Sequence, residues 1–307
     1  MRSYWKVAGV QMNCRLGDKA FNVAEVCRKL REAAHGGAHL VVFPECCLTG
    51  YGFESREAIR QVAEPLPGPS TEIIARECRR HHVWAVVGLF ESTEQGQLFN
   101  SAALIGPEGF AASYRKIHLP CVGADRFTDP GDRPFAVHDL GGLRLGINIC
   151  FDGSFPESAR ILTLLGADLI VLPTNWAPNA RRMAELVASA RAWENHVYYL
   201  AVNRVGDEAG FHYIGLSSAA DYMGNLLYFA PPDVEEIFTI DVYPAEAANK
   251  RVVHCHGVYE IDRVNWRRPE MYAPLVEPMG MPFRGHYNAE RKTPAGRTTS
   301  PQPAAVS

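Results

Sequence analysis

Three residues of the sequence have the side chains that a thiol-based nucleophilic reaction needs. Glu45 follows the apolar run LVVFP, Lys116 ends the run AASYRK, and Cys150 ends the run LRLGINI. A carboxylate in an apolar setting acquires a higher pKa, which suits it to carry a proton near neutral pH. A deprotonated thiol attacks electrophilic carbon, and a lysine cation stabilises the negative charge that develops. The three residue types together predict a base, a cation and a nucleophile.

The residues after Cys150 favour a helix that begins beside the thiol. Ser154 and Glu157 have the spacing of a capping box at a helix start. The positive end of a helix dipole favours a thiolate, and the backbone N–H of Phe151 is available to help hold an oxyanion. A lone cysteine after a strand is usually only packing. The nucleophile prediction therefore depends on the base and the cation being nearby.

The elements that must bring these residues together alternate between strands and helices, in two similar halves. In the first half we expect strands at 7–12, 40–43 and 83–89, helices at 20–34 and 70–80, and a hairpin over 101–117. In the second half we expect strands at 143–149, 167–173 and 197–203, helices at 155–165 and 183–196, and a hairpin over 215–230. Both halves thus run strand, helix, strand, helix, strand, hairpin.

This alternation predicts an α/β fold in which helices cover one face of each sheet. Two such halves would bury their open sheet faces against each other, giving a four-layer αββα sandwich with two quasi-repeated halves in one domain. A single doubly wound sheet is the alternative, and the hairpin that closes each half fits it less well. We expect the domain to span 1–283. The Pro-, Thr- and Ser-rich end of the chain predicts a partly disordered extension over 284–307.

Composition argues against several classes of partner. The 307 residues are 47% hydrophobic and 21% charged, with a formal net charge of −3, which is ordinary for a soluble globular protein. No basic arm predicts a nucleic-acid partner, and no apolar run has membrane-spanning length. The first residues do not resemble a secretory signal, and the eight cysteines are scattered without a CxxC pair. We therefore expect a cytoplasmic protein with reduced cysteines and no metal site.

Several segments of the sequence resemble the nitrilase, or carbon–nitrogen hydrolase, superfamily. They are VVFPECCLTGY, YRKIHLP with DRFTDPGD, LGINICFDGSFPESARILTLLGADLIVLPTNW, RAWENHVYYLAVNRVG, GLSSAADYMGN and RRPEMYAPL. They span roughly residues 4–277, and their combination is highly specific. The resemblance, closest to an amidase-like branch, implies an αββα sandwich that pairs across helices into a homodimer or larger homo-oligomer. It implies no metal or organic cofactor.

The resemblance also implies roles for the three residues. Glu45 is then the general base, Lys116 the oxyanion-stabilising cation and Cys150 the nucleophile. Many members have a second glutamate about nine residues after the lysine, and here that place holds Asp125. Its shorter side chain sets the carboxylate back by about 1.5 Å. An accessory catalytic role for Asp125 therefore stands against a loop salt bridge to Arg126 or to a neighbouring residue.

Four more residues are candidates for contact with the substrate, because the strands before them are expected to end at the same opening of the active site. Tyr51 and Phe53 follow the Glu45 strand, and Asn175 and Trp176 end the strand after the Cys150 helix. An aromatic ring such as that of Trp176 is able to pack against an apolar acyl group. A wedge in a subunit interface is the alternative for Trp176.

The predicted reaction is hydrolysis of a small carboxamide to a carboxylate and ammonia, through a thioester on Cys150. An N-carbamoyl (ureido) hydrolase or a nitrilase would use the same three residues, so these alternatives stay open. A carbamoylase usually needs a cationic clamp for the substrate carboxylate, for which Arg126, Arg181 and Arg182 are the candidates. A scaffold without activity and a redox protein that pairs Cys150 with a second cysteine are the less favoured alternatives.

Overall fold

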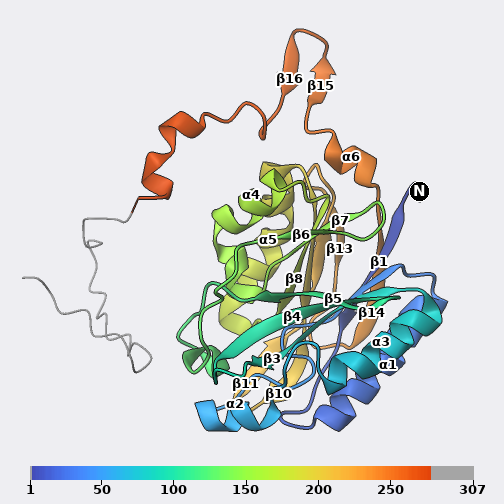
Figure 1. Cartoon of the computed structure of the whole chain (residues 1–307). Coiled ribbons are helices and arrows are strands. Elements are labelled where there is room, and N and C mark those ends of the chain that lie inside the picture. The colour runs from blue at the N-terminus through green and yellow to red at the C-terminus, as the bar shows by residue number, and fades with distance from the viewer. Residues whose placement is uncertain (1, 278–307) are drawn as a thin grey trace, which may run out of the picture. The chain divides into compact units, whose positions relative to one another are not determined.

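Both predicted halves belong to one compact unit of the chain. The computed structural model describes residues 2–277, and the chain divides into the units Met1–Asn265 and Trp266–Ser307. The first unit holds both sheets (Figure 1). The described part of the second unit has two short 3-10 turns, Pro269–Met271 and Ala273–Leu275. The predicted extension over 284–307, and its boundary at residue 283, lie outside the described residues.

The first sheet is built from the first half of the chain and one returning strand. Its order is β14-β1-β2-β3-β4-β5, in which β1, β2 and β3 are parallel and the other pairs antiparallel. The strands are β1 (Trp5–Gln11), β2 (Leu40–Val42), β3 (Trp84–Ser92), β4 (Leu98–Gly106), β5 (Gly109–Arg115) and β14 (Glu236–Val242). The helices of this half are α1 (Lys19–His35), α2 (Arg56–Val62) and α3 (Pro69–His81).

The second sheet repeats this plan. Its order is β13-β12-β9-β8-β7-β6, in which β7, β8 and β9 are parallel. The strands are β6 (Val137–Asp139), β7 (Arg144–Ile147), β8 (Leu169–Thr174), β9 (Tyr198–Asn203), β12 (Ser218–Ala220) and β13 (Leu226–Phe229). The helices are α4 (Pro156–Leu164) and α5 (Arg181–Asn195).

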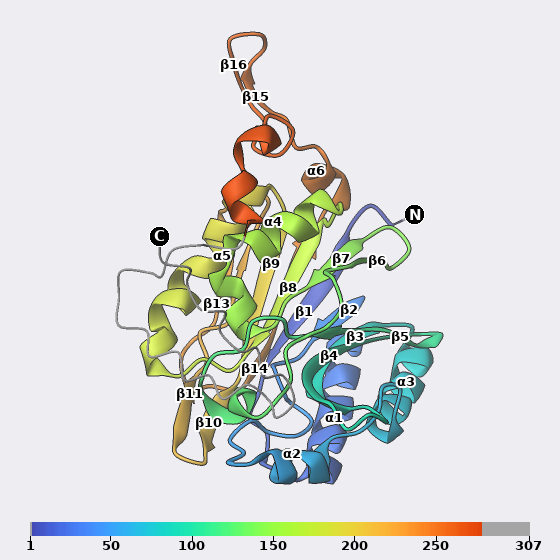
Figure 2. The same cartoon turned by 60° about the vertical axis from the view of Figure 1, so that its left-hand side comes forward.

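Alternation of side chains along each strand produces the layers. In β2, Leu40 and Val42 join the core between the two sheets, whereas Val41 packs with the residues of α1 and α3. In β8, Val171 joins the same inter-sheet core, whereas Ile170 packs with the residues of α4 and α5. The layers are therefore helices, sheet, sheet and helices, with the two helix pairs on opposite outer faces (Figure 2). The predicted four-layer sandwich is confirmed.

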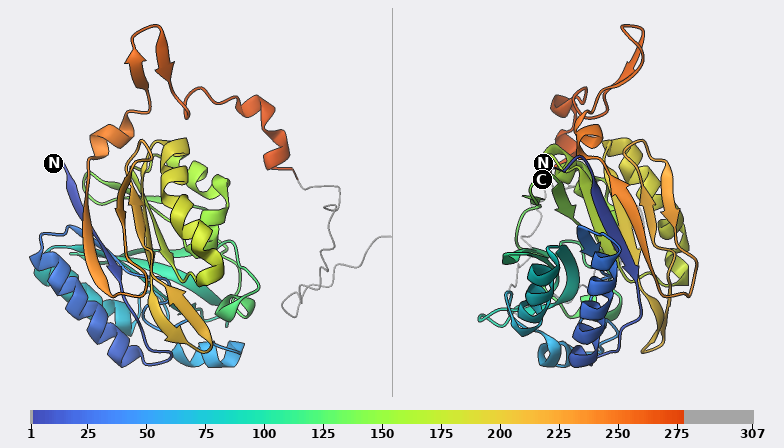
Figure 3. Two further views of the ribbon diagram at one scale, coloured as in Figure 1. Left: turned by 180° about the vertical axis from the view of Figure 1, so that it is seen from behind. Right: turned by 90° about the vertical axis from the view of Figure 1, so that its right-hand side faces the viewer.

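One strand returns from the second half to the first sheet. β14 pairs antiparallel with β1 from Trp5 opposite Val242 to Gln11 opposite Glu236 (Figure 3). Its sequence EIFTIDV alternates apolar and polar residues, as a strand does, but a plan of two separate halves has no place for it. Other elements absent from the sequence analysis are α2, β6, β10 (Val205–Glu208), β11 (Phe211–Ile214), α6 (Pro244–Ala248), β15 (Val252–Cys255) and β16 (Tyr259–Ile261).

The helix α3 starts one residue before the expected range 70–80, so Ser70 is not the cap that such a start would make it. The helix begins at Pro69, with Gly68 as its N-cap. Proline is favoured at the first helical position because its fixed φ suits the helix and its missing N–H is not needed there. Ser70 therefore lies in the first turn, where its hydroxyl donates to Glu64 Oε2 at 3.1 Å.

Candidate active site

Glu45 lies in a tight turn that begins just after β2. The turn packs directly on Gly88 of β3, where a Cβ atom would lie 2.3 Å from the backbone nitrogen of Cys46. Glycine in mid-strand is needed where another backbone approaches this closely. Cys46 itself has a φ of +49°, in the left-handed region. The turn buries Glu45, which is 1% exposed.

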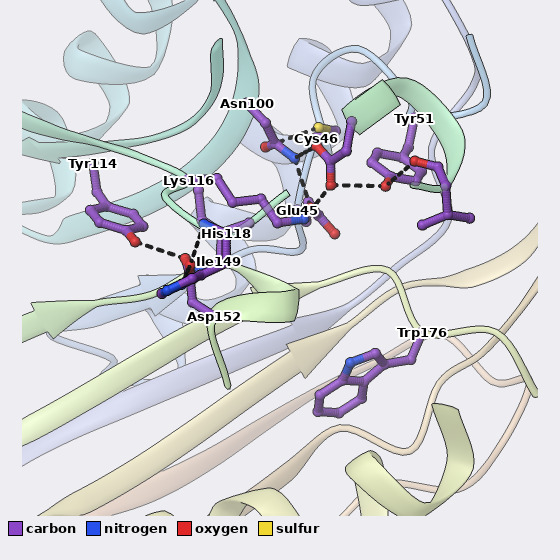
Figure 4. Close-up of polar contacts among 12 residues, drawn as sticks. Glu45, Cys46, Tyr51, Asn100, Tyr114, Lys116, His118, Ile149, Asp152 and Trp176 are labelled. Carbon is purple, nitrogen blue, oxygen red and sulfur yellow. Dashed lines mark hydrogen bonds and ion pairs between the residues drawn. The ribbon is translucent and has the colours of Figure 1, made fainter. Parts of the chain in front are cut away.

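Lys116 joins the two acidic side chains of the site. Its Nζ lies 2.7 Å from Glu45 Oε1 and 2.5 Å from Asp125 Oδ2, and all three side chains are buried (Figure 4). Burial acts to lower the pKa of Lys116, but Asp125 and Glu45 outweigh it and raise that pKa well above its usual range. Lys116 is therefore a permanent cation. The predicted alternative of a salt bridge from Asp125 to Arg126 is not formed, since Arg126 Nε donates to the carbonyl of Gly123.

Asn100 is a member of this cluster that the sequence analysis missed. Its Nδ2 donates to Glu45 Oε1 at 2.8 Å and to Asp125 Oδ1 at 2.9 Å. Its Oδ1 accepts from the Cys46 thiol at 3.4 Å, which agrees with this orientation of the amide. Asn100 could have been found from the pairing of β4 with β5, which places it opposite Lys116. The N–H of Lys116 donates to the carbonyl of Asn100 at 2.8 Å.

Cys150 begins a 3-10 turn, Cys150–Ser154, directly after β7. Its φ is +44°, a strained conformation for a residue with a side chain, and such strain is frequent at active sites. The predicted capping box is wrong, because α4 begins at Pro156 with Phe155 as its N-cap and no side-chain cap. Phe151 lies in the first turn, where backbone N–H groups have no partner within the helix.

The surroundings of Cys150 favour the thiol, although the sequence analysis expected a helix dipole that favours the thiolate. Burial raises the pKa of Cys150 to about 12, and the charge of Glu45 adds to this. Lys116, the backbone N–H of Asn175 and the hydroxyl of Thr174 act in the opposite direction without cancelling the rise. The thiol therefore needs a base.

Glu45 has the properties of that base. Burial raises its pKa, against the lowering effect of Lys116. Both hydrogen bonds to its carboxylate reach Oε1. Its Oε2 is buried and has no hydrogen-bond partner within residues 2–277. One carboxylate oxygen is thus anchored and the other is free to accept a proton.

Tyr51 contacts Asp125. Its hydroxyl lies 3.0 Å from Asp125 Oδ2 and 3.0 Å from the carbonyl oxygen of Val122. Gly123, with a φ of +51°, makes this possible, because a Cβ there would lie 2.2 Å from the Tyr51 ring. The substrate contact predicted for Tyr51 stays a prediction, and the side chain has a defined partner in the site.

The other predicted contact residues lie in different surroundings. Phe53 packs edge-on against Phe90, with ring centroids 5.8 Å apart. The Trp176 side chain is 4% exposed and packs among residues of β8, β9 and α5, so it is not a surface wedge between subunits. Asn175 is also buried, and neither polar atom of its amide has a hydrogen-bond partner within the described part of the chain. Asn175 is therefore the candidate with unused hydrogen-bonding capacity.

A second polar cluster, also missed from the sequence, supports the Cys150 turn. Asp152 Oδ2 accepts from the Tyr114 hydroxyl at 2.8 Å and from the N–H of Ile149 at 3.0 Å. Asp152 Oδ1 lies 2.7 Å from His118 Nδ1 (Figure 4). The His118 ring in turn stacks on Phe155. His118 and Asp152 each follow a predicted catalytic residue by two positions. The cluster ties the chain after β5 to the nucleophile turn.

Within the part of the chain that the structure describes, the other cysteines and acidic residues form neither a disulfide nor a metal site. All eight cysteines are free thiols in the structure, and Cys46 is fully buried. Within residues 2–277 no group of three or more His, Cys, Asp or Glu side chains is arranged to hold a metal ion. No helix in this range has the length and apolar character to cross a membrane.

Comparisons with known proteins identify the family of the chain. The model of the carbon–nitrogen hydrolase family matches residues 6–251. A nitrilase from Pyrococcus abyssi is 39% identical over 87% of this chain and 98% of its own length, and an (R)-stereoselective amidase from a Pseudomonas species is 35% identical over 80% and 88%. A solved superfamily protein from Xanthomonas campestris is 28% identical, with a TM-score of 0.72 over 81% of this chain and 93% of that one. The chain thus belongs to the carbon–nitrogen hydrolase family of the nitrilase superfamily and is a hydrolase of non-peptide carbon–nitrogen bonds.

Proposed function

We propose that the protein hydrolyses a small carboxamide to a carboxylate and ammonia through a thioester on Cys150. The observation that carries the proposal is the asymmetry of Glu45. Lys116 and Asn100 hold Oε1, and Oε2 is unpartnered within residues 2–277. Such a carboxylate is suited to receive the Cys150 proton and then to deliver it to a leaving amine.

In the first half-reaction, Glu45 takes the proton of the Cys150 thiol as the sulfur attacks the amide carbon. Because the pKa of the thiol is about 12, proton transfer accompanies the attack. Lys116 and the backbone N–H of Phe151 stabilise the oxyanion that forms. The C–N bond then breaks, the amine receives the proton from Glu45 and leaves as ammonia, and the acyl group stays on sulfur.

In the second half-reaction, Glu45 takes a proton from water as the water attacks the thioester carbon. The same oxyanion contacts stabilise the second tetrahedral intermediate. The C–S bond breaks, the carboxylic acid leaves and ionises in solution, and the proton on Glu45 returns to the Cys150 sulfur. Asp125 and Lys116 stay paired throughout, so Asp125 holds the cation in place without exchanging protons. These steps need only side chains, backbone amides and water.

The arrangement of the arginines favours an amide over an N-carbamoyl substrate. Arg181 and Arg182 both pair with Glu185 on the exposed face of α5. Arg126 is exposed, donates to the Gly123 carbonyl and lies over Phe127. None of the three offers an unpaired, buried cation to a substrate carboxylate.

A nitrile is the second candidate substrate, because the Pyrococcus abyssi relative is called a nitrilase. Attack of the Cys150 thiolate on a nitrile carbon would give a thioimidate, which water converts to the same thioester with loss of ammonia. The Pseudomonas relative, called an amidase, supports the amide. Measuring the rate of ammonia release from an amide and from a nitrile distinguishes the two substrates.

We propose in addition that two copies of the chain pair across the helices of the second half. Large apolar side chains are exposed there: Ile161, Leu164, Leu165, Leu186 and Trp193. Exposed apolar patches of this kind mark protein interfaces. Light scattering of wild type and of Trp193→Glu measures the molecular mass, and a wild-type monomer would contradict the pairing.

The function is tested by measuring ammonia release from small carboxamides, N-carbamoyl amino acids and nitriles. Wild type, Cys150→Ala and the control Cys255→Ala, which changes an exposed cysteine, are compared. We expect turnover of carboxamides that only Cys150→Ala abolishes, together with an acyl adduct on Cys150 by intact-mass spectrometry. Turnover that survives in Cys150→Ala would contradict the mechanism, and a preference for nitriles or carbamoyl compounds would replace the substrate class.

A further inference from the structure

The loop that carries Tyr51 closes around a buried carboxylate of the second half, Glu208. The backbone N–H groups of Tyr51 and Gly52 both donate to Glu208 Oε1 at 2.7 Å. A Cβ atom on Gly50 would lie 2.7 Å from Glu208 Oε2, and one on Gly52 would lie 3.3 Å from Oε1. The two glycines on either side of Tyr51 therefore leave the space that the carboxylate occupies.

Arg204 neutralises this carboxylate and is itself buried. One Nη donates to Glu208 Oε2 at 2.9 Å, and the other donates to Asn13 Oδ1 at 3.0 Å and to the carbonyl of Cys14 at 2.9 Å. The guanidinium lies 4.3 Å from the centre of the Tyr213 ring. Replacement of a buried ion pair by apolar residues is often neutral or stabilising. Stability alone thus does not account for an ion pair here.

We propose that Glu208 is a positioning residue of this hydrolase, which acts on the active site by holding the Tyr51 loop in place. The Tyr51 hydroxyl, 3.0 Å from Asp125 Oδ2, then fixes Asp125. Asp125 in turn holds the ammonium group of Lys116 at 2.5 Å. The inference rests on the catalytic role proposed above for Lys116.

Asn100 also holds Asp125, and Glu45 also holds Lys116. A displaced loop therefore shifts the cation without releasing it from the site. Lys116 lowers the pKa of Glu45, and this effect weakens when Lys116 moves away. The pKa of Glu45 then rises. The acid limb, which is the fall of kcat/KM at low pH as Glu45 becomes protonated, moves to higher pH. The other titratable groups that interact electrostatically with Glu45 are Asp125, Cys150, Cys46, Tyr213 and Tyr51. All five are unchanged in Glu208→Gln, so the shift of the acid limb is read from that variant. A general loss of stability would not move this limb.

The test compares Glu208→Gln, Tyr51→Phe and the double variant on a substrate that wild type hydrolyses. Glutamine keeps the size of the side chain, but its single oxygen cannot serve both the loop N–H groups and Arg204. We expect kcat to fall about tenfold to a hundredfold, as for a small misplacement of a catalytic group, with KM nearly unchanged and the acid limb shifted upward. Because both residues act through one path, the double variant should lose no more than the more damaging single variant.

The matched control is Glu64→Gln, another buried carboxylate that accepts a backbone N–H, from Ser70 at 3.1 Å. It should keep the wild-type kcat and acid limb. If Glu208→Gln does not fold, Glu208→Asp serves instead, because it keeps the charge beside Arg204 but withdraws the carboxylate by about 1.5 Å.

Strictly additive losses in the double variant, or an unshifted acid limb in Glu208→Gln or its Asp substitute, would overturn the positioning role. Lys116→Ala separates this result from a failure of the proposed function. If Lys116→Ala keeps its activity, the proposed function fails, and the positioning role with it. If it loses activity while Glu208→Gln behaves as wild type, only the positioning role is wrong.

Discussion

The turn after β2 and the turn after β8 occupy equivalent places in the two halves, but the first carries an ionisable side chain and the second a neutral one. Each follows the middle one of the three parallel strands of its sheet and lies beside a proline, with VVFPE leading to Glu45 and IVLPTN leading to Asn175. Glu45 is ionisable and is held by Lys116 and Asn100. Asn175 is neutral, and its buried amide has no hydrogen-bond partner in the described range.

The two turns are also held in place differently. The Glu45 turn packs on Gly88, where no side chain would fit. The turn at Asn175 is held by Asn203, whose Oδ1 accepts the N–H of Trp176 at 2.7 Å and whose Nδ2 donates to the carbonyl of Gly215 at 2.6 Å. Buried polar groups without partners are rare and call for an explanation. The same turn of the repeated scaffold thus carries a buried carboxylate in one half and a buried, unpartnered amide in the other, as far as residues 2–277 show.

The largest effect should come from removing the charge of the first turn. Glu45→Gln keeps the shape of the side chain but cannot accept the Cys150 proton, so kcat should fall by about 10²- to 10⁴-fold, as for loss of a general base. Steady-state kinetics with a carboxamide measure this, and thermal unfolding checks that the variant is folded. A loss of less than tenfold in a folded variant would show that another group takes the proton.

A smaller effect should come from displacing the first turn without changing its charge. Gly88→Ala places a methyl group 2.3 Å from the Cys46 nitrogen, so the turn must shift and kcat should fall by about a hundredfold. Ala85→Gly in the same strand is the control, because it weakens β3 without a clash. Equal losses in the two variants would mean that β3 stability, and not the position of Glu45, limits activity.

In the second turn, Asn175→Ala should affect substrate binding more than folding. Its amide has no partner to lose within residues 2–277, whereas a bound substrate would lose a hydrogen bond of about 1 kcal/mol. We expect KM to rise roughly five- to tenfold, with no loss of thermal stability. Wild-type kinetics combined with a lower melting temperature would instead assign Asn175 a purely structural role.

The smallest effect should come from a partner of the first turn. The hydrogen bond from Asn100 lowers the pKa of Glu45, which burial has raised. Asn100→Ala removes this bond, so that pKa rises further and the acid limb of kcat/KM moves to higher pH. At pH values well above the limb, the loss should be less than about tenfold. A pH profile measures the shift, and Asn195→Ala, a buried asparagine at the end of α5, should leave it unchanged.

Much of the fold was predictable because its elements have local signatures. The alternation in LVV and LIVLP, the apolar faces of α1 and α5, and the Gly-Pro turn of the β4–β5 hairpin are visible in short windows. β14 was missed because its partner β1 lies more than 200 residues earlier in the chain. The start of α4 was mistaken because Ser154 extends the 3-10 turn after Cys150 instead of capping the helix.

Some features of the site were likewise predictable from the sequence, and others required the structure. The sequence by itself determined the reactive residue types, their places at strand ends and the resemblance to the nitrilase superfamily, because each depends on local residue order. Only the tertiary structure decided that Asp125 contacts Lys116, that Asn100 joins the two carboxylates, and that burial keeps Cys150 a thiol. These properties depend on distances and burial among residues remote in sequence, which local patterns do not encode.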